Sequence, residues 1–162
     1  MDLLKLKDDE LIQFYSESIK ELKRRGVLRT NNVVGDLGEH LAIDYFCKTP
    51  GLPNLAAAPV GTQNIDAISR SGDRYSIKST SGHVTGVFYG LEPAGSAQPD
   101  QQKFEYVLIC KFNENCGLEA IYQLTWAAFL AHKRWHSRMK AWNLTLTKAL
   151  IADATIIYQK EA

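Results

Sequence analysis

Alternating hydrophobic and polar residues indicate two neighbouring strands between residues 61 and 80. The segments NIDAIS and RYSIKS both alternate, and the Ser-Gly-Asp sequence between them is typical of a tight turn. Asp66 lies on one side of the first strand, and Lys78 lies on one side of the second. Facing positions on paired strands are about 5 Å apart. The pattern therefore predicts a hairpin that brings Asp66 and Lys78 close together.

Similar patterns predict the other elements of the chain. Helices are expected at 8–25, at 36–48 and from 126 to about 139; strands at 55–60, 104–112 and 118–124; a strand-like end to 79–89; a polar loop at 91–103; and a short helix followed by a final strand within 144–158. Residues 104–112 are nearly continuous in apolar residues, which is typical of a strand covered on both faces. The elements predict an α/β fold with a mixed central sheet flanked by helices.

The domain organisation follows from the length of the chain. At 162 residues it fits one domain with a core of its own, residues 1–162. We expect a helical extension at 1–30, a core at 35–124 and a C-terminal helix and strand at 125–162.

Composition narrows the classes of function only slightly. Hydrophobic residues make up 45% of the chain and charged residues 23%, as in ordinary globular proteins. The net charge of +1 gives no global basic signature, although a local basic patch remains open. Three cysteines without metal-ligand spacing indicate reduced thiols. No apolar run is long enough for a membrane span and no signal peptide is recognised, so a cytoplasmic location without membrane contact is expected.

Glu39 is an acidic residue near the inward edge of the helix predicted at 36–48. On its own, it would be an ordinary first-turn glutamate favoured by the helix dipole. Asp66 and Lys78 could likewise be a simple cross-strand ion pair. Charges held inside a sheet are costly unless they are paired or used. The three residues therefore form the candidate site.

Three motifs occur in order: G-x-x-G-E-H-L-A at 35–42, N-I-D-A-I at 64–68 and Y-S-I-K-S at 75–79. This order resembles the PD-(D/E)XK nuclease superfamily, which includes restriction endonucleases, junction resolvases and small phage-defence and repair nucleases. The resemblance covers roughly residues 35–80, with weaker support through 104–112. It implies a restriction endonuclease-like core.

The resemblance also implies a set of site residues. Asp66 would be the central ligand of Mg²⁺, for which Mn²⁺ can substitute, and Glu39 would reach the metal directly or through water. Lys78 would be the lysine of the motif, and the backbone carbonyl of Ile77 a further metal ligand. Mg²⁺ activates water and stabilises charge on phosphoryl oxygens, and a lysine can orient the attacking water.

Ser76 departs from the family pattern, which has Asp or Glu two residues before the lysine. Three alternatives follow: Glu39 compensates, Glu92 supplies the missing acid from fourteen residues after Lys78, or the site is catalytically inactive. Ser76 itself would then be a supporting residue. Gln63 and Asn64 precede Asp66 and are further supporting candidates that could touch substrate or water.

Candidate nucleic-acid contacts lie in two segments. Ser79 and Thr80 follow the motif lysine and could donate hydrogen bonds to a phosphate; the alternative is a polar strand end. A second set consists of cations on the helix predicted after residue 125: Lys133, Arg134, Arg138 and Lys140. The alternative for these is a solvated outer face. A metal clip formed by His132 and His136 is not favoured, because no third ligand is in sight.

The function expected from this pattern is a metal-dependent endonuclease that hydrolyses DNA phosphodiester bonds in restriction, phage defence or repair. Its expected partner is nucleic acid, with double-stranded DNA preferred, and a homodimer remains open. One alternative is a catalytically inactive nucleic-acid-binding module of the same fold. A second alternative is a structural or interaction protein.

Overall fold

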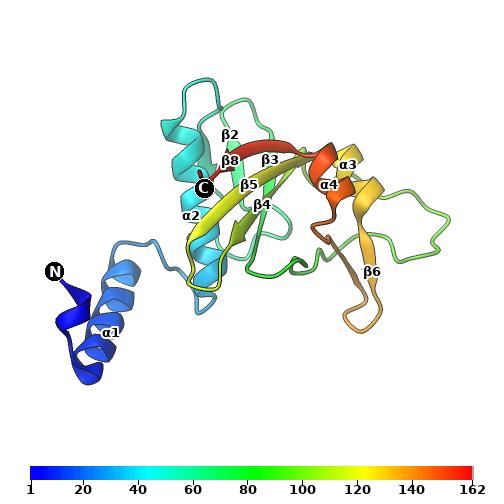
Figure 1. Cartoon of the computed structure of the whole chain (residues 1–162). Helices are drawn as coiled ribbons and strands as arrows, with labels where there is room; N and C mark the ends of the chain where they lie inside the picture. The colour runs from blue at the N-terminus through cyan, green and yellow to red at the C-terminus, as the bar shows by residue number, and fades with distance from the viewer. Residues whose placement is uncertain (162) are drawn as a thin grey trace.

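The computed structural model describes residues 1–161. Its helical elements are η1 (Leu3–Lys5, a 3-10 turn), α1 (Asp8–Arg24), α2 (Val33–Lys48), α3 (Trp126–His132) and α4 (Lys148–Asp153). Its strands are β1 (Leu55–Ala57), β2 (Ala67–Ser69), β3 (Arg74–Thr80), β4 (Tyr106–Phe112), β5 (Leu118–Thr125), β6 (Arg134–His136), β7 (Ala141–Asn143) and β8 (Thr155–Gln159). Figure 1 shows their arrangement along the chain.

Six strands form one mixed sheet in the order β1-β2-β3-β4-β5-β8. The β3–β4 pair is parallel and the other neighbouring pairs are antiparallel. The segment that crosses from β3 to β4 contains no helix. The predicted class, a single α/β domain with a mixed sheet flanked by helices, is confirmed.

The sheet has a hydrophobic core on each face. Leu108 and Cys110 of β4 pack in the core beneath α2, with Ala42 and Phe46 of that helix. The neighbouring strand positions turn to the other face, where the core contains Val107, Ile109, Phe129 and Leu150. Because β4 is buried on both faces, its nearly continuous apolar sequence is explained.

Helix α2 begins earlier than the predicted start near Asp36. Asn32 caps it by accepting a hydrogen bond from Gly35 N at 3.1 Å. Asp36 is buried in the first turn, and its Oδ2 accepts hydrogen bonds from the backbone N–H groups of Arg29 (2.8 Å) and Thr30 (2.6 Å). The carboxylate of Asp36 thus fixes the preceding segment against the helix.

The prediction of a long helix from 126 to about 139 holds for the first two turns and is wrong for the residues after them. Thr125 caps α3 as expected, but α3 ends at His132, and β6 and β7 then form a separate two-stranded sheet. Trp135 packs edge-on against Trp142, with 5.2 Å between ring centroids. This tertiary contact outweighs the local helical spacing. We call residues 134–143 the ribbon.

Three other predicted strands are shorter or absent. Strand β1 ends at Ala57, and β2 begins at Ala67, because Asn64 has a φ of 60° and leaves the extended conformation. The strand-like end of 79–89 forms only isolated bridges, Val84 with Thr145 and Phe88 with Trp142.

Helix α1 stands apart from the sheet in Figure 1. It has no buried residue, and its apolar side chains Leu11, Ile12 and Tyr15 are 41%, 69% and 66% exposed. Among residues 1–161, none of the helices combines the length and apolar character needed to cross a bilayer.

Candidate functional site

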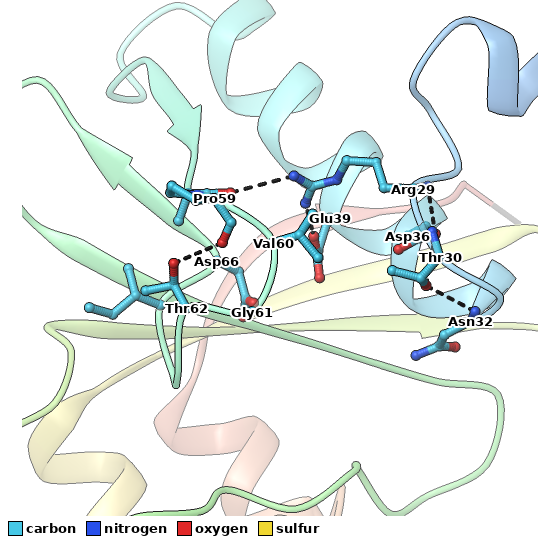
Figure 2. A pocket seen from close by; sticks show the side chains of 12 residues that line it. Arg29, Thr30, Asn32, Asp36, Glu39, Pro59, Val60, Gly61, Thr62 and Asp66 are labelled. Atoms are coloured by element: carbon cyan, nitrogen blue, oxygen red, sulfur yellow. Dashed lines mark hydrogen bonds and ion pairs between the residues drawn. The ribbon is translucent and has the colours of Figure 1, made fainter.

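Glu39 and Asp66 line one cavity of about 200 Å³, although 26 residues separate them in the sequence. Glu39 comes from the second turn of α2, and Asp66 lies directly before β2. Arg29 and the turn at Pro59 to Thr62 complete the walls. Figure 2 shows this cavity, which we call the carboxylate cavity.

Asp66 lies at the fork where β2 separates from β3. Its backbone N–H donates to Tyr75 O at 2.8 Å, and its side-chain Oδ2 accepts from Ile77 N at 2.6 Å. The carboxylate therefore takes the N–H that a continuing antiparallel strand would use. In an extended strand, the C=O of a residue points to the same edge as its N–H, so the Ile77 carbonyl faces this fork.

Burial shifts the pKa values of both carboxyl groups upward. Burial is the largest cause for Asp66. For Glu39, burial is again the largest cause, and the negative charge of Asp66 raises the pKa further. Burial lowers the pKa of the Lys78 amine, while Asp66 and Glu39 act in the opposite direction. The three predicted residues are therefore brought together as one electrostatically coupled group.

Lys78 does not form a simple ion pair with Asp66. Within residues 1–161, no carboxylate oxygen lies within 4.0 Å of its amine. Its Nζ lies 4.9 Å from the centroid of the Phe88 ring, in a cation–π contact. The alternative of a cross-strand salt bridge is therefore wrong: both carboxylates influence the amine, but neither contacts it directly.

Arg29 is a charged cavity residue that the sequence did not reveal. Its Nη2 pairs with Glu39 Oε2 at 2.5 Å, and its Nη1 donates to the carbonyl of Ala58 at 3.4 Å. Figure 2 shows the guanidinium between Glu39 and the turn at Pro59. Arg29 lies in a loop between two helices, where no periodic pattern relates it to Glu39. The contact exists because Asp36 folds this loop onto α2.

The donor set suits a hard divalent cation only in part. Residues 1–161 contain no group of three or more His, Cys, Asp or Glu side chains placed to hold a metal. The fork offers two carboxylates and one backbone carbonyl, all oxygen donors, and Mg²⁺ is commonly held by one or two carboxylates while keeping several waters. The residues present therefore fit Mg²⁺, provided that Glu39 shares or exchanges its contact with Arg29.

The supporting candidates have different surroundings. Ser76 is fully buried and its hydroxyl makes no hydrogen bond within residues 1–161, although it lies close enough to Asp66 to favour the charged carboxylate. Asn64 donates through Nδ2 to Tyr89 O at 2.7 Å, which fixes the loop before Asp66. Gln63 is exposed and lies beside Gly90.

Glu92 takes no part in the cavity. Its Oε2 accepts from Ser96 Oγ at 2.9 Å within its own loop. It is not among the charges that shift the pKa values of Glu39, Asp66 or Lys78. Migration of an acid from this position is therefore not supported by the geometry.

The two hydroxyls after Lys78 do not face a ligand. The Ser79 Oγ is buried against Gly38 of α2, and the structure gives it no partner among the described residues. Thr80 Oγ1 donates to Val84 O at 2.8 Å and accepts from Gly82 N at 3.1 Å. The structure favours the alternative, a polar strand end, over a phosphate contact.

The predicted cationic cluster divides into two kinds of residue. Lys133 is only 14% exposed and pairs with Asp100 at 2.5 Å. It therefore holds the base of the ribbon in place and does not face a ligand. Arg134, Arg138 and Lys140 are exposed. His132 pairs with Asp153, and His136 Nδ1 accepts a hydrogen bond from Met139 N.

Fold and site define an α/β protein with two neighbouring carboxylates and a half-buried lysine where two strands of the sheet separate. Comparison of the chain with protein-family models and with curated proteins gives no match.

Proposed function

We propose that this protein is a metal-dependent endonuclease that hydrolyses phosphodiester bonds in DNA, with Glu39, Asp66 and Lys78 as its catalytic residues. The observation that carries the proposal is the convergence of two half-buried carboxylates on one cavity, with a lysine near them that forms no ion pair within residues 1–161. Perturbed ionisable groups that gather in a cleft are typical of active sites. The motif order described above supports the same class of enzyme.

Each residue has a distinct task in this proposal. Asp66 and Glu39 would hold Mg²⁺ or Mn²⁺ together with the Ile77 carbonyl. When bound, the metal lowers the pKa of water and stabilises charge on phosphoryl oxygens. Lys78 orients the attacking water and stabilises the negative charge that develops on the phosphate. Its amine is held over the Phe88 ring and is therefore placed before substrate arrives.

The neutral Ser76 leaves the site one acid short of the family pattern. Glu39 is the acid that compensates, because it lines the cavity with Asp66, whereas Glu92 bonds within its own loop. Arg29 holds Glu39 in place, and a bound cation would share this carboxylate with the guanidinium.

The test is cleavage of supercoiled plasmid DNA by the purified full chain with Mg²⁺, with Mn²⁺ and with chelator. We expect metal-dependent nicking that is lost in Asp66→Asn. Glu114→Gln changes an exposed acid in the turn before β5 and is the matched control. Equal nicking by Asp66→Asn and the control would reject the site.

A second candidate function is a catalytically inactive nucleic-acid-binding module. It is favoured by one observation, the Arg29–Glu39 ion pair at 2.5 Å, because a guanidinium there supplies the positive charge that a metal would otherwise bring. This candidate predicts DNA binding that is sensitive to salt, unaffected by chelator and never followed by cleavage.

A structural or interaction protein, which would use the exposed face of α1, predicts no nucleic-acid binding at low salt. The three free cysteines fit a cytoplasmic location for each of these functions.

A further inference from the structure

We propose that the ribbon enters the major groove of double-stranded DNA and holds the duplex across the carboxylate cavity. This inference rests on the proposed function for its target, and it assigns the substrate class as duplex rather than single-stranded DNA. It begins from the shape of the segment, which Figure 1 shows projecting away from the main sheet. A two-stranded antiparallel ribbon of this kind fits the major groove, which is about 12 Å wide.

The charge of the ribbon is of one sign. Residues 134–143 contain three Lys or Arg residues and no Asp or Glu. Arg134, Arg138 and Lys140 are exposed, and within residues 1–161 none of them forms an ion pair. Exposed cations without acidic partners suit contacts to the phosphates that flank a groove.

The base of the ribbon is fixed, so its tip is presented in a defined direction. Lys133 pairs with Asp100 and lies 3.8 Å from the centroid of the Trp142 ring. Trp142 Nε1 donates to Glu92 O at 2.7 Å, and its ring packs against Trp135. A rigid base reduces the entropy cost of binding.

The ribbon is also connected to the candidate catalytic residues. Phe88 N donates to Trp142 O at 2.7 Å, and the Phe88 ring lies under the Lys78 amine. The next residue, Tyr89, accepts a hydrogen bond from Asn64, two residues before Asp66. One short segment, 88–89, therefore contacts the ribbon, the lysine and the loop of the aspartate. A duplex held by the ribbon is placed relative to both catalytic groups.

The experiment measures binding of the full chain to a fluorescent DNA duplex in the presence of chelator, so that cleavage cannot occur. The ribbon variant is Arg134→Ser/Arg138→Ser/Lys140→Ser. The matched control is Lys20→Ser/Lys23→Ser/Arg70→Ser, which removes three exposed cations outside the ribbon that form no ion pair within residues 1–161. Near-ultraviolet circular dichroism of the Trp135–Trp142 pair reports whether the ribbon remains folded.

We expect the affinity of the ribbon variant for the duplex to fall by at least about tenfold. The slope of log affinity against log salt concentration should become shallower by about 0.9 for each phosphate that the variant no longer neutralises. The control keeps its affinity within about twofold. The effect is smaller for single-stranded DNA and for duplex RNA, because the major groove of RNA is too narrow and deep for side chains to read.

Two results would overturn the inference: equal affinities of the ribbon variant and the control, or an equal fall in affinity for duplex DNA and duplex RNA. Failure of the proposed catalytic function is separate from these. It would appear as ribbon-dependent binding by a protein that cuts no DNA with Mg²⁺ or Mn²⁺, and Asp66→Asn would bind the duplex in either case.

Discussion

The carboxylate cavity and the ribbon hold their charges in opposite ways. Burial shifts the pKa values of Glu39 and Asp66, which line the cavity, and of Lys78, which lies near them and is influenced by both carboxylates. On the ribbon, Arg134 and Arg138 are exposed to solvent. Buried, coupled charges are expensive to keep and are suited to chemistry, whereas exposed cations are suited to attracting and positioning a polyanion. The difference teaches that burial decides whether charged side chains perturb one another or remain open to solvent.

The largest effect expected from this comparison is a separation of turnover from binding. Lys78→Met keeps the length of the side chain and removes its charge, and we expect cleavage to fall by about 1,000-fold with little change in DNA affinity. Arg134→Ser should instead weaken affinity several-fold and leave the rate at saturating DNA nearly unchanged. Steady-state cleavage kinetics separate the two. If Lys78→Met acted only on affinity, the cavity and the ribbon would have the same task.

The next effect distinguishes two acids. Glu39→Gln removes the cavity carboxylate that faces Asp66, and we expect cleavage to fall by about 100-fold together with a higher Mg²⁺ requirement. Glu92→Gln changes an acid that bonds to Ser96 in its own loop, and activity should remain within about twofold of the parent protein. A Mg²⁺ titration of both variants checks this. The reverse ranking would show that Glu92 supplies the missing acid.

A third effect concerns the packing that positions Glu39. A Cβ added at Gly38 would lie 1.8 Å from Ser79 Oγ, so Gly38→Ala should lower the free energy of unfolding by about 1–3 kcal/mol. Adding Ser79→Ala removes the hydroxyl and should recover part of that stability. Urea unfolding of both variants measures it. Gly86→Ala is the control, because a Cβ there meets no atom within 4 Å. Equal costs at Gly38 and Gly86 would contradict the close α2–β3 contact.

The smallest effect is a pH-dependent change in stability. Burial raises the pKa of Asp66 above its ordinary 3.8, so the native state binds its proton more tightly than the unfolded chain does. The contribution of Asp66 to stability is therefore present below the unfolded pKa and is lost as pH rises through the folded value. Relative to the parent protein, Asp66→Asn should gain stability between about pH 4 and pH 7.

The measurement is chemical denaturation at several pH values across that range. The exposed Glu114→Gln should show no such trend. A stability difference for Asp66→Asn that stayed constant with pH, or fell as pH rose, would mean that burial does not set the charge of the carboxyl group.

Two kinds of information decided this structure. Local pattern was sufficient for β3 and β4, because alternation and continuous apolar character reflect which faces are buried. It was sufficient for α1 as well, whose helical spacing holds although its apolar face remains exposed. The pattern also indicated that Glu39, Asp66 and Lys78 lie near one another. The alternation of side chains along a strand and their spacing along a helix limit the directions in which these residues can point.

Tertiary contacts decided what the local pattern could not express. The stretch after His132 has helical spacing, yet it forms the ribbon because Trp135 and Trp142 pack on each other and Lys133 reaches Asp100 across the chain. Arg29 meets Glu39 only because Asp36 folds its loop onto α2. Such contacts join residues distant in sequence. Their free energy comes from burial and pairing that appear only once the chain is folded, so no periodicity in the sequence announces them.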